Sequence, residues 1–208
     1  MSKLAGTVIR AKVLDHVELV CPRCGVDRDG RVVDLERWGC LLGLPVLRLT
    51  QLGQMIECSQ CGYRAGMCVL EIPTAAVLTA RLEAAMRSAM ATMVRAADDP
   101  SRNDFDLTDE VVRAMRSAGY TYDASVLAED LAGTDDIETS ARLRLLIDDL
   151  TPHGKQGFLH RMIAIALADG PLSANERRSL ERMGGALGMA RPHLIGVLGT
   201  ASQPFQPA

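Results

Sequence analysis

Cys21-Pro22-Arg23-Cys24-Gly25 and Cys58-Ser59-Gln60-Cys61-Gly62 are two copies of one short pattern, and they decide the fold of the first third of the chain. Together they supply four thiolates with the spacing of a tetrahedral metal site. The glycine after each pair can take a positive φ, which lets backbone N–H groups turn toward the sulfur atoms. We therefore predict that Cys21, Cys24, Cys58 and Cys61 hold one structural zinc ion.

Iron is the alternative metal, because rubredoxins also bind their ion with paired Cys-x-x-Cys-Gly turns. Rubredoxins are compact and rich in aromatic residues, whereas Trp38 and Tyr63 are the only aromatic residues in this part of the chain. Zinc is therefore favoured over a rubredoxin-like electron carrier.

Short strands separated by turns are predicted for the first 72 residues, with Gly and Pro at the breaks. The expected strands are 7–13, 31–35 and 46–49. Between the two cysteine pairs lie 33 residues, which is room for one or two β-hairpins. We expect residues 1–72 to form a zinc ribbon, in which the metal replaces the core that so small a unit lacks.

The length of 208 residues suits one sizeable domain or two small ones. The hydrophobic content of 48% is enough for a packed core, so we expect a globular chain. Lys3, Arg10 and Lys12 interrupt the only apolar runs near the start, and no run reaches the roughly 18 apolar residues of a membrane helix. We expect a cytoplasmic protein without a signal peptide. A reducing compartment favours metal ligation over disulfides for the six cysteines.

The net charge of −3 argues against binding to polyanions. The first 72 residues hold 9 basic and 8 acidic residues, and the remainder holds 14 and 18. Neither part has the clustered Lys and Arg that contact with a nucleic-acid backbone requires. Nucleic-acid binding by the ribbon stays open as the alternative function, because many zinc ribbons act in transcription and translation.

Helical periodicity begins after Pro73, where apolar residues recur every three or four positions from Leu78 to Ala97 and predict a helix of about six turns. Further helices are expected around 111–118, 124–131, 137–150, 154–168, 173–187 and 191–198. The sequence therefore predicts an all-α domain over residues 73–198 and a flexible tail over 199–208.

An internal repeat is also suggested by the helical part. Met90–Asp98 and Arg161–Asp169 have similar apolar patterns and both end on an aspartate. Each is followed by a loop, a helix and a glycine, and the distances from Asp98 to Gly119 and from Asp169 to Gly188 are nearly equal. This predicts two helical hairpins packed about a pseudo-two-fold axis. The alternative is chance, since apolar helical patterns match one another easily.

Two cysteines lie outside the metal motif. Cys40 is in an apolar stretch and Cys68 in a predicted strand, so we expect both to be small buried hydrophobic residues. The stretch Trp38–Leu47 carries no charge. We expect it to pack against the helices, and the alternative is an exposed tip that docks on a partner or a membrane.

Asp169-Gly170 and Glu176 form the other chemically suggestive group, because two carboxylates near one helix junction can bind a hard cation. The alternative is a capping box formed by Ser173 and Glu176, with Asp169-Gly170 as an ordinary helix end. The sequence has no Gly-x-Ser-x-Gly, no phosphate-binding loop and no dinucleotide fingerprint. We therefore expect no enzymatic activity.

Resemblances to two known families cover most of the chain from Cys21 to Leu198. The N-terminal residues resemble a bacterial zinc-ribbon family found at the start of small proteins. The matching residues are Cys21–Arg28, Arg37–Trp38, Leu44–Leu47, Leu52–Gly53 and Glu57–Gly62. In those relatives an aromatic run usually precedes the proline, whereas Gly39–Gly43 stands there in this chain, so a function carried by exposed aromatic residues is not implied.

The second resemblance is to the TerB-like family, which is associated with tellurite resistance and general stress. The residues that carry it are Leu150–Lys155, Ala168–Glu176 and Gly188–Met189. It implies an all-helical bundle of two related halves with an acidic metal-binding site. On this resemblance Asp169 and Glu176 match one half and Asp98 matches the first aspartate of the other, with Asp109 or Glu110 as its partner.

These observations predict a small β zinc ribbon followed by an all-α TerB-like bundle. The predicted function is a non-enzymatic, metal-sensing or protein-interaction module of a stress response. The implied cofactors are Zn²⁺ and a second divalent cation such as Ca²⁺, bound by Asp98, Asp169 and Glu176. The implied partner is an unidentified protein, with neither nucleic acid nor a transmembrane segment expected.

Overall fold

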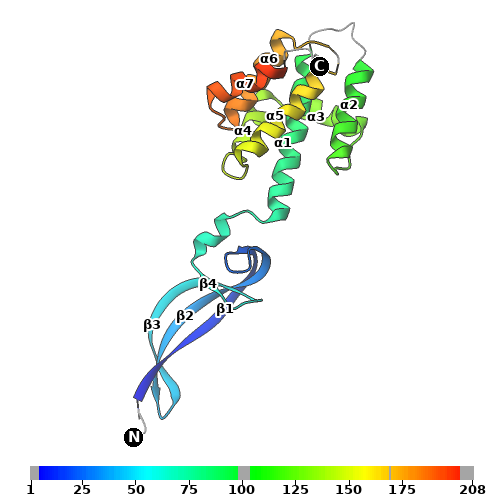
Figure 1. Ribbon diagram of the computed structural model, residues 1–208. Coiled ribbons are helices and arrows are strands. Elements are labelled where there is room, and N and C mark those ends of the chain that lie inside the picture. The colour runs from blue at the N-terminus through cyan, green and yellow to red at the C-terminus, as the bar shows by residue number, and fades with distance from the viewer. Residues whose placement is uncertain (1–4, 98–103, 169, 202–208) are drawn as a thin grey trace. The chain divides into compact units, whose positions relative to one another are not determined.

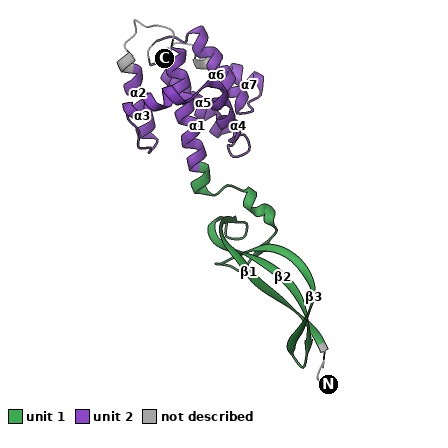
Figure 2. Cartoon of the chain, turned by 180° about the vertical axis from the view of Figure 1, so that it is seen from behind, with its two compact units in different colours: residues 1–78 green, residues 79–208 purple. Residues whose placement is uncertain are grey.

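A computed structural model of the chain describes residues 5–97, 104–168 and 170–201. The chain forms two compact units, residues 1–78 and 79–208 (Figure 2). The first unit is built on a β-sheet and the second is a bundle of helices. This confirms the predicted order of a small β region followed by an all-α region.

Three long antiparallel strands and one short strand make up the sheet of the first unit (Figure 1). The strands are β1 (Ala5–Cys21), β2 (Val26–Leu41), β3 (Leu44–Cys58) and β4 (Arg64–Ala65), and they lie side by side in this order. A short 3-10 helix, η1 (Met67–Glu71), follows the sheet.

The strands are far longer than the predicted segments 7–13, 31–35 and 46–49. β1 pairs with β2 from Cys21 opposite Val26 to Ala5 opposite Leu41. The register shifts once within this pair and at three places between β2 and β3. Each shift adds a residue to one strand, which breaks the two-residue alternation on which strand prediction depends.

The sheet unit has a small hydrophobic core near its cysteine turns. Leu19, Val32, Ile56 and Val69 form the buried cluster, and partly buried Val17 packs against it. A core of this size buries little apolar surface, so a unit built on it needs a further source of stability such as a bound metal ion.

The second unit consists of helices joined by short loops (Figure 1). They are α1 (Ala75–Ala96), which begins in the first unit, α2 (Asp104–Ser117), α3 (Ala124–Gly133), α4 (Asp136–Arg144), α5 (Pro152–Ala166), α6 (Ala174–Ala186) and α7 (Arg191–Ala201). On α1 the side chains of Met86, Met90 and Met93 are buried, as the apolar period predicts.

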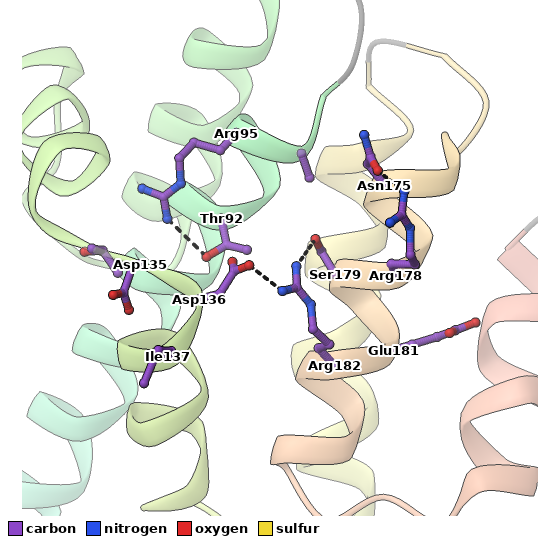
Figure 3. Close-up of a pocket in the computed structure, with 12 residues that line it drawn as sticks. Thr92, Arg95, Asp135, Asp136, Ile137, Asn175, Arg178, Ser179, Glu181 and Arg182 are labelled. Atoms are coloured by element: carbon purple, nitrogen blue, oxygen red, sulfur yellow. Dashed lines mark hydrogen bonds and ion pairs between the residues drawn. The ribbon is translucent and has the colours of Figure 1, made fainter.

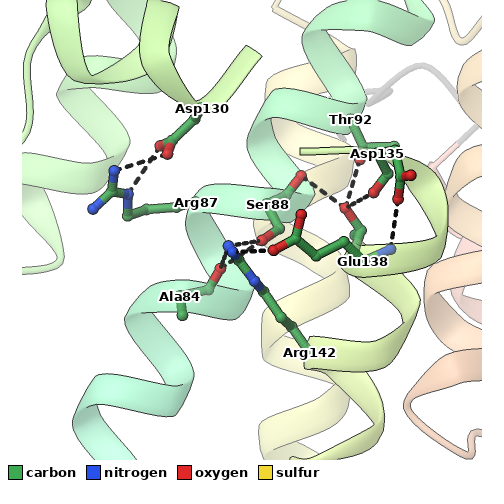
Figure 4. Close-up of polar contacts among 9 residues, drawn as sticks. Ala84, Arg87, Ser88, Thr92, Asp130, Asp135, Glu138 and Arg142 are labelled. Atoms are coloured by element: carbon green, nitrogen blue, oxygen red, sulfur yellow. Dashed lines mark hydrogen bonds and ion pairs between the residues drawn. The ribbon is translucent and has the colours of Figure 1, made fainter. Parts of the chain in front are cut away.

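Buried polar contacts join α1 to α4 (Figure 4). The hydroxyl oxygens of Thr92 and Thr139 lie 3.0 Å apart, and Arg142 Nη1 donates to Ser88 Oγ at 2.6 Å. These hydroxyl groups are buried, so the hydrogen bonds replace the water that the groups lose on folding.

Several predicted helix ends differ from the structure, and the helix expected around 111–118 begins seven residues earlier, at Asp104. The helix expected at 137–150 ends at Arg144, and turns follow it to residue 150. Asp148 and Asp149 would place two negative charges at the C-terminus of a longer helix, where they oppose the helix dipole. α7 continues to Ala201, past the expected end at residue 198.

The predicted pseudo-two-fold repeat is not confirmed by the arrangement of the helices.

Among the described helices, none combines the length and the apolarity that are needed to cross a bilayer.

Candidate metal centre

Each cysteine pair lies in a tight turn that follows a long strand. Cys21 is the last residue of β1 and Cys58 is the last residue of β3. The Gly25 N–H donates to the Cys21 carbonyl at 2.8 Å, and the Gly62 N–H donates to the Cys58 carbonyl at 2.9 Å. The φ angles of Gly25 and Gly62 are 72° and 67°, so both turns end in the left-handed region. A side chain with a β-carbon is strained there, which explains the glycine after each pair.

Antiparallel pairing brings the two turns together. In the sheet register, β2 places Val26 opposite Cys21 and Gly30 opposite Cys58. The Ser59 N–H also donates to the Asp29 carbonyl at 2.9 Å, which ties the second turn to β2. Two motifs that are far apart in the sequence therefore meet at one end of the sheet.

The four sulfur atoms of Cys21, Cys24, Cys58 and Cys61 all lie within 4.8 Å of one another. The Sγ atoms of Cys21 and Cys61 are 3.7 Å apart. A tetrahedron with zinc–sulfur bonds of about 2.3 Å has sulfur–sulfur edges of about 3.8 Å. All six cysteines are free thiols, so no disulfide competes for these sulfur atoms. The cluster can hold one metal ion such as zinc.

The thiols of the cluster ionise unequally. A hydrogen bond from the Cys24 backbone, opposed by burial, lowers the pKa of the Cys21 thiol to about 7. Contact with the Cys61 sulfur, followed by burial, raises the pKa of the Cys24 thiol to about 12. One thiolate forms readily and the next is disfavoured, because its charge would add to the first. A bound cation offsets this repulsion, so metal binding and loss of the thiol protons are coupled.

Cys40 and Cys68 do not join the cluster. Cys40 is partly exposed in β2. For Cys68 the expectation of a buried residue in a strand is wrong, because it is exposed in the 3-10 helix η1. The surrounding apolar run Met67–Leu70 is too short for periodicity to distinguish a strand from a helical turn.

Of the acidic residues assigned to a second cation site, Glu176 lies in the described part of the chain. It is 1% exposed at the start of α6. Its Oε2 accepts from the Ser173 N–H at 2.7 Å, and the Ser173 hydroxyl accepts from the Glu176 N–H at 3.2 Å. This is the capping box that the sequence offered as the alternative. Asp98 and Asp169 lie outside the described residues, so the cation site remains a prediction.

The two possible partners of Asp98 have different surroundings on α2. Asp109 is exposed, whereas Glu110 forms an ion pair with Arg113 one turn along the helix. The structure does not bring either residue to Glu176 in a cluster of metal-binding side chains among the described residues.

Comparison with protein families identifies the helical part. The family described as "Tellurite resistance protein TerB" matches residues 77–197, which is more than half of the chain. The chain belongs to the TerB family. No curated protein and no solved structure matches it. The TerB match begins in the first turn of α1 and ends in α7, so it covers the helical unit and leaves the cysteine cluster outside.

The TerB domain has a cavity of about 1060 Å³ between α1, α4 and α6 (Figure 3). Arg182 on α6 forms an ion pair with Asp136 on α4 and donates to Ser179 Oγ at 3.0 Å. On the α1 side of the cavity, Arg95 donates to the Leu131 carbonyl at 3.0 Å. The sequence does not predict this cavity, because its walls come from three helices that no motif links. The one available signal was the i,i+4 spacing of Arg178 and Arg182 on one helix face.

Proposed function

We propose that this chain is a non-enzymatic member of the TerB family whose N-terminal ribbon is stabilised by one zinc ion. Cys21, Cys24, Cys58 and Cys61 are its ligands. In this proposal the ribbon and the helical domain act through protein contacts in a stress response that includes tellurite resistance. The chain works in a reducing compartment, where its thiols stay available for metal.

The observation that carries the proposal is the convergence of the four sulfur atoms within 4.8 Å. Four thiolates fill the first coordination shell of zinc and leave no position for a substrate, which is typical of a structural ion. The small core of the sheet unit supports the same role, because metal binding then contributes directly to folding.

Elemental analysis of the purified, reduced chain tests the zinc site. We expect one zinc ion per chain, and we expect Cys58→Ser to lose it. Cys68→Ser is the matched control, because Cys68 is exposed and lies outside the cluster, and it should keep the full zinc content. A folded, reduced sample without metal would overturn the zinc proposal. A red, iron-containing sample would replace it with the electron-carrier alternative.

The role in stress is tested in cells that lack the native protein. We expect the parent chain and Cys68→Ser to restore growth on tellurite, and we expect Cys58→Ser to fail. Affinity capture from the same cells should recover a protein partner with the parent chain and not with Cys58→Ser. Retention on heparin at moderate salt would instead favour the nucleic-acid alternative.

A second divalent cation is a further part of the proposal, and the burial of Glu176 at the start of α6 supports it. Calcium titration by calorimetry is the test. We expect heat of binding for the parent chain and for Asp148→Ala, an exposed aspartate outside the α5–α6 junction. We expect none for Asp169→Ala. Equal heats for parent and Asp169→Ala would contradict the cation site.

A further inference from the structure

The sheet unit exposes an apolar tip where β2 turns into β3. The tip consists of Leu41, Leu42, Leu44, Val46 and Leu47, and each of these side chains is more than half exposed. Exposed apolar surface that is contiguous, rather than scattered, marks an interaction site. The ribbon's own core lies at the opposite end of the long strands, near the cysteine turns.

The backbone of the tip is strained at its centre. Leu42 has a φ of 52°, the one positive value among the described residues other than glycine. A two-residue hairpin turn with positive φ at both positions favours Asn-Gly, and here it is Leu42-Gly43. The turn therefore presents a leucine side chain that is 72% exposed at a position where a polar residue fits the backbone better.

Three described strand segments next to the turn carry no charged residue. The strand segments there are Ala5–Ile9 on β1, Trp38–Leu41 on β2 and Leu44–Leu47 on β3. Where these segments end, three arginines lie at neighbouring levels of the sheet register. Arg37 precedes Trp38, Arg48 lies opposite Trp38, and the Arg10 guanidinium stacks 5.7 Å from the centre of the Trp38 ring.

The carboxylates near this level leave most of the positive charge uncompensated. Glu36 accepts from the Trp38 indole N–H at 3.0 Å and lies 3.3 Å from Arg48. Arg10 and Arg37 have no carboxylate within ion-pair distance among the described residues. The apolar tip is therefore bordered by a tryptophan and by a basic collar, defined as Arg10, Arg37 and Arg48.

The spacing of the apolar tip, Trp38 and the basic collar along the strands matches the layers of a lipid bilayer surface. Leu41, which pairs with Leu44, is three positions beyond Trp38 on β2, and this distance is about 10 Å at the rise of a β-strand. Apolar faces of peripheral proteins enter a bilayer by about 5–10 Å. Tryptophan is enriched at the boundary between headgroups and acyl chains, and arginine pairs with headgroup phosphates.

We propose that the apolar tip inserts into the surface of an anionic lipid bilayer, with the basic collar on the headgroup phosphates. The charge pattern favours lipid over a second copy of this chain, because tip-to-tip packing would bring two basic collars together. It also favours anionic over neutral lipid, because two of the three arginines lack a carboxylate partner in the described structure.

Flotation of the full chain with lipid vesicles tests the insertion. The vesicles are neutral phosphatidylcholine, alone or with about 30% phosphatidylglycerol. We expect the parent chain to bind the anionic vesicles and to be released by salt, and Leu44→Asp to weaken binding about tenfold or more. Ile137→Asp is the matched control, because Ile137 is an equally apolar side chain, 80% exposed on α4, and it should bind like the parent.

Trp38 gives an independent readout, because it is the only tryptophan of the chain. We expect its emission to shift to the blue with anionic vesicles and to be quenched by brominated acyl chains. Leu42→Asn separates insertion from folding, since Asn tolerates the positive φ. This variant should keep or raise the melting temperature while its vesicle binding falls.

Equal vesicle binding by Leu44→Asp and Ile137→Asp would overturn the proposal, as would unchanged Trp38 emission. A dimer that Leu44→Asp converts to a monomer, without vesicle binding by the parent, would assign the tip to a second copy and reject lipid.

Discussion

Arg87 on α1 and Asp130 on α3 form a two-pronged ion pair, with Nε 2.9 Å from Oδ2 and Nη2 2.8 Å from Oδ1 (Figure 4). The Tyr122 hydroxyl also donates to Asp130 Oδ2 at 2.7 Å. Asp130 is buried and Arg87 is about one-third exposed. The network therefore joins α1 to α3 and supplies hydrogen-bond donors to the buried carboxylate of Asp130.

Loss of the carboxylate should destabilise the helical unit. Asp130→Ala removes the carboxylate that accepts two hydrogen bonds from Arg87 and one from the Tyr122 hydroxyl. We expect a loss of about 2–3 kcal/mol in the free energy of unfolding, measured by urea denaturation. Glu110→Ala breaks an ion pair with Arg113 on the surface, and this control should change stability by less than about 0.5 kcal/mol.

The same network predicts how stability depends on pH in the alkaline range. Burial, followed by the hydrogen bond to Asp130, raises the pKa of Tyr122 well above its ordinary value. The unfolded chain releases this proton near pH 10, while the folded chain retains it. The contribution of Tyr122 is therefore complete below pH 10 and is lost as pH rises toward the folded pKa. Unfolding experiments across this range should show a shallower decline in stability for Tyr122→Phe than for the parent. An identical decline in the two proteins would contradict the role of Tyr122.

Neighbouring glycines on α6 should respond oppositely to alanine. A β-carbon on Gly184 would lie 2.5 Å from Leu194 Cδ1 of α7, whereas one on Gly185 would meet no atom within 4 Å. Gly185→Ala should therefore stabilise the chain by about 0.5–1 kcal/mol through helix propensity. Gly184→Ala should destabilise it by about 1–2 kcal/mol, because buried Leu194 must move. Thermal unfolding compares the two. Equal melting temperatures would mean that α7 does not pack on α6 as closely as the structure has it.

The parts of this protein that the sequence predicted are those where local chemistry determines structure. Cys21 and Cys58 each open a four-residue turn whose glycine and backbone hydrogen bond are specified within the motif. The apolar period of α1 predicted that Met86 and Met90 face the interior, because a helix buries one face. The capping box of Ser173 and Glu176, which the sequence offered as the alternative to a cation site, follows from a three-residue spacing alone.

The parts that the sequence did not predict depend on contacts between distant segments. The lengths of β1–β3 depend on pairing across register shifts, which no single strand encodes. The ion pair of Arg87 with Asp130 joins residues 43 positions apart. The cavity beside Arg182 exists only once α1, α4 and α6 have packed. The backbone strain at Leu42 could not be predicted either, since leucine disfavours that conformation.

The positive φ of Gly62 gives the last prediction, which concerns the metal turn. Gly62→Ala places a β-carbon on a backbone with φ of 67°, which costs about 1–2 kcal/mol although no atom lies within 4 Å of the new group. The strain opposes the hydrogen bond from the Gly62 N–H to the Cys58 carbonyl, so the sulfur atoms are less well placed. We expect zinc affinity to fall about tenfold in competition with a coloured chelator.

Gly66→Ala is the matched control for this change, because Gly66 has an ordinary φ of −68° and a β-carbon there would make only a normal contact with Cys68. It should keep the parent's zinc affinity. Gly62→Asn should fall between the two, since asparagine tolerates the left-handed region better than alanine does. If Gly62→Ala binds zinc as tightly as Gly66→Ala, the prediction is wrong, and Gly62 does not hold the left-handed conformation when metal is bound.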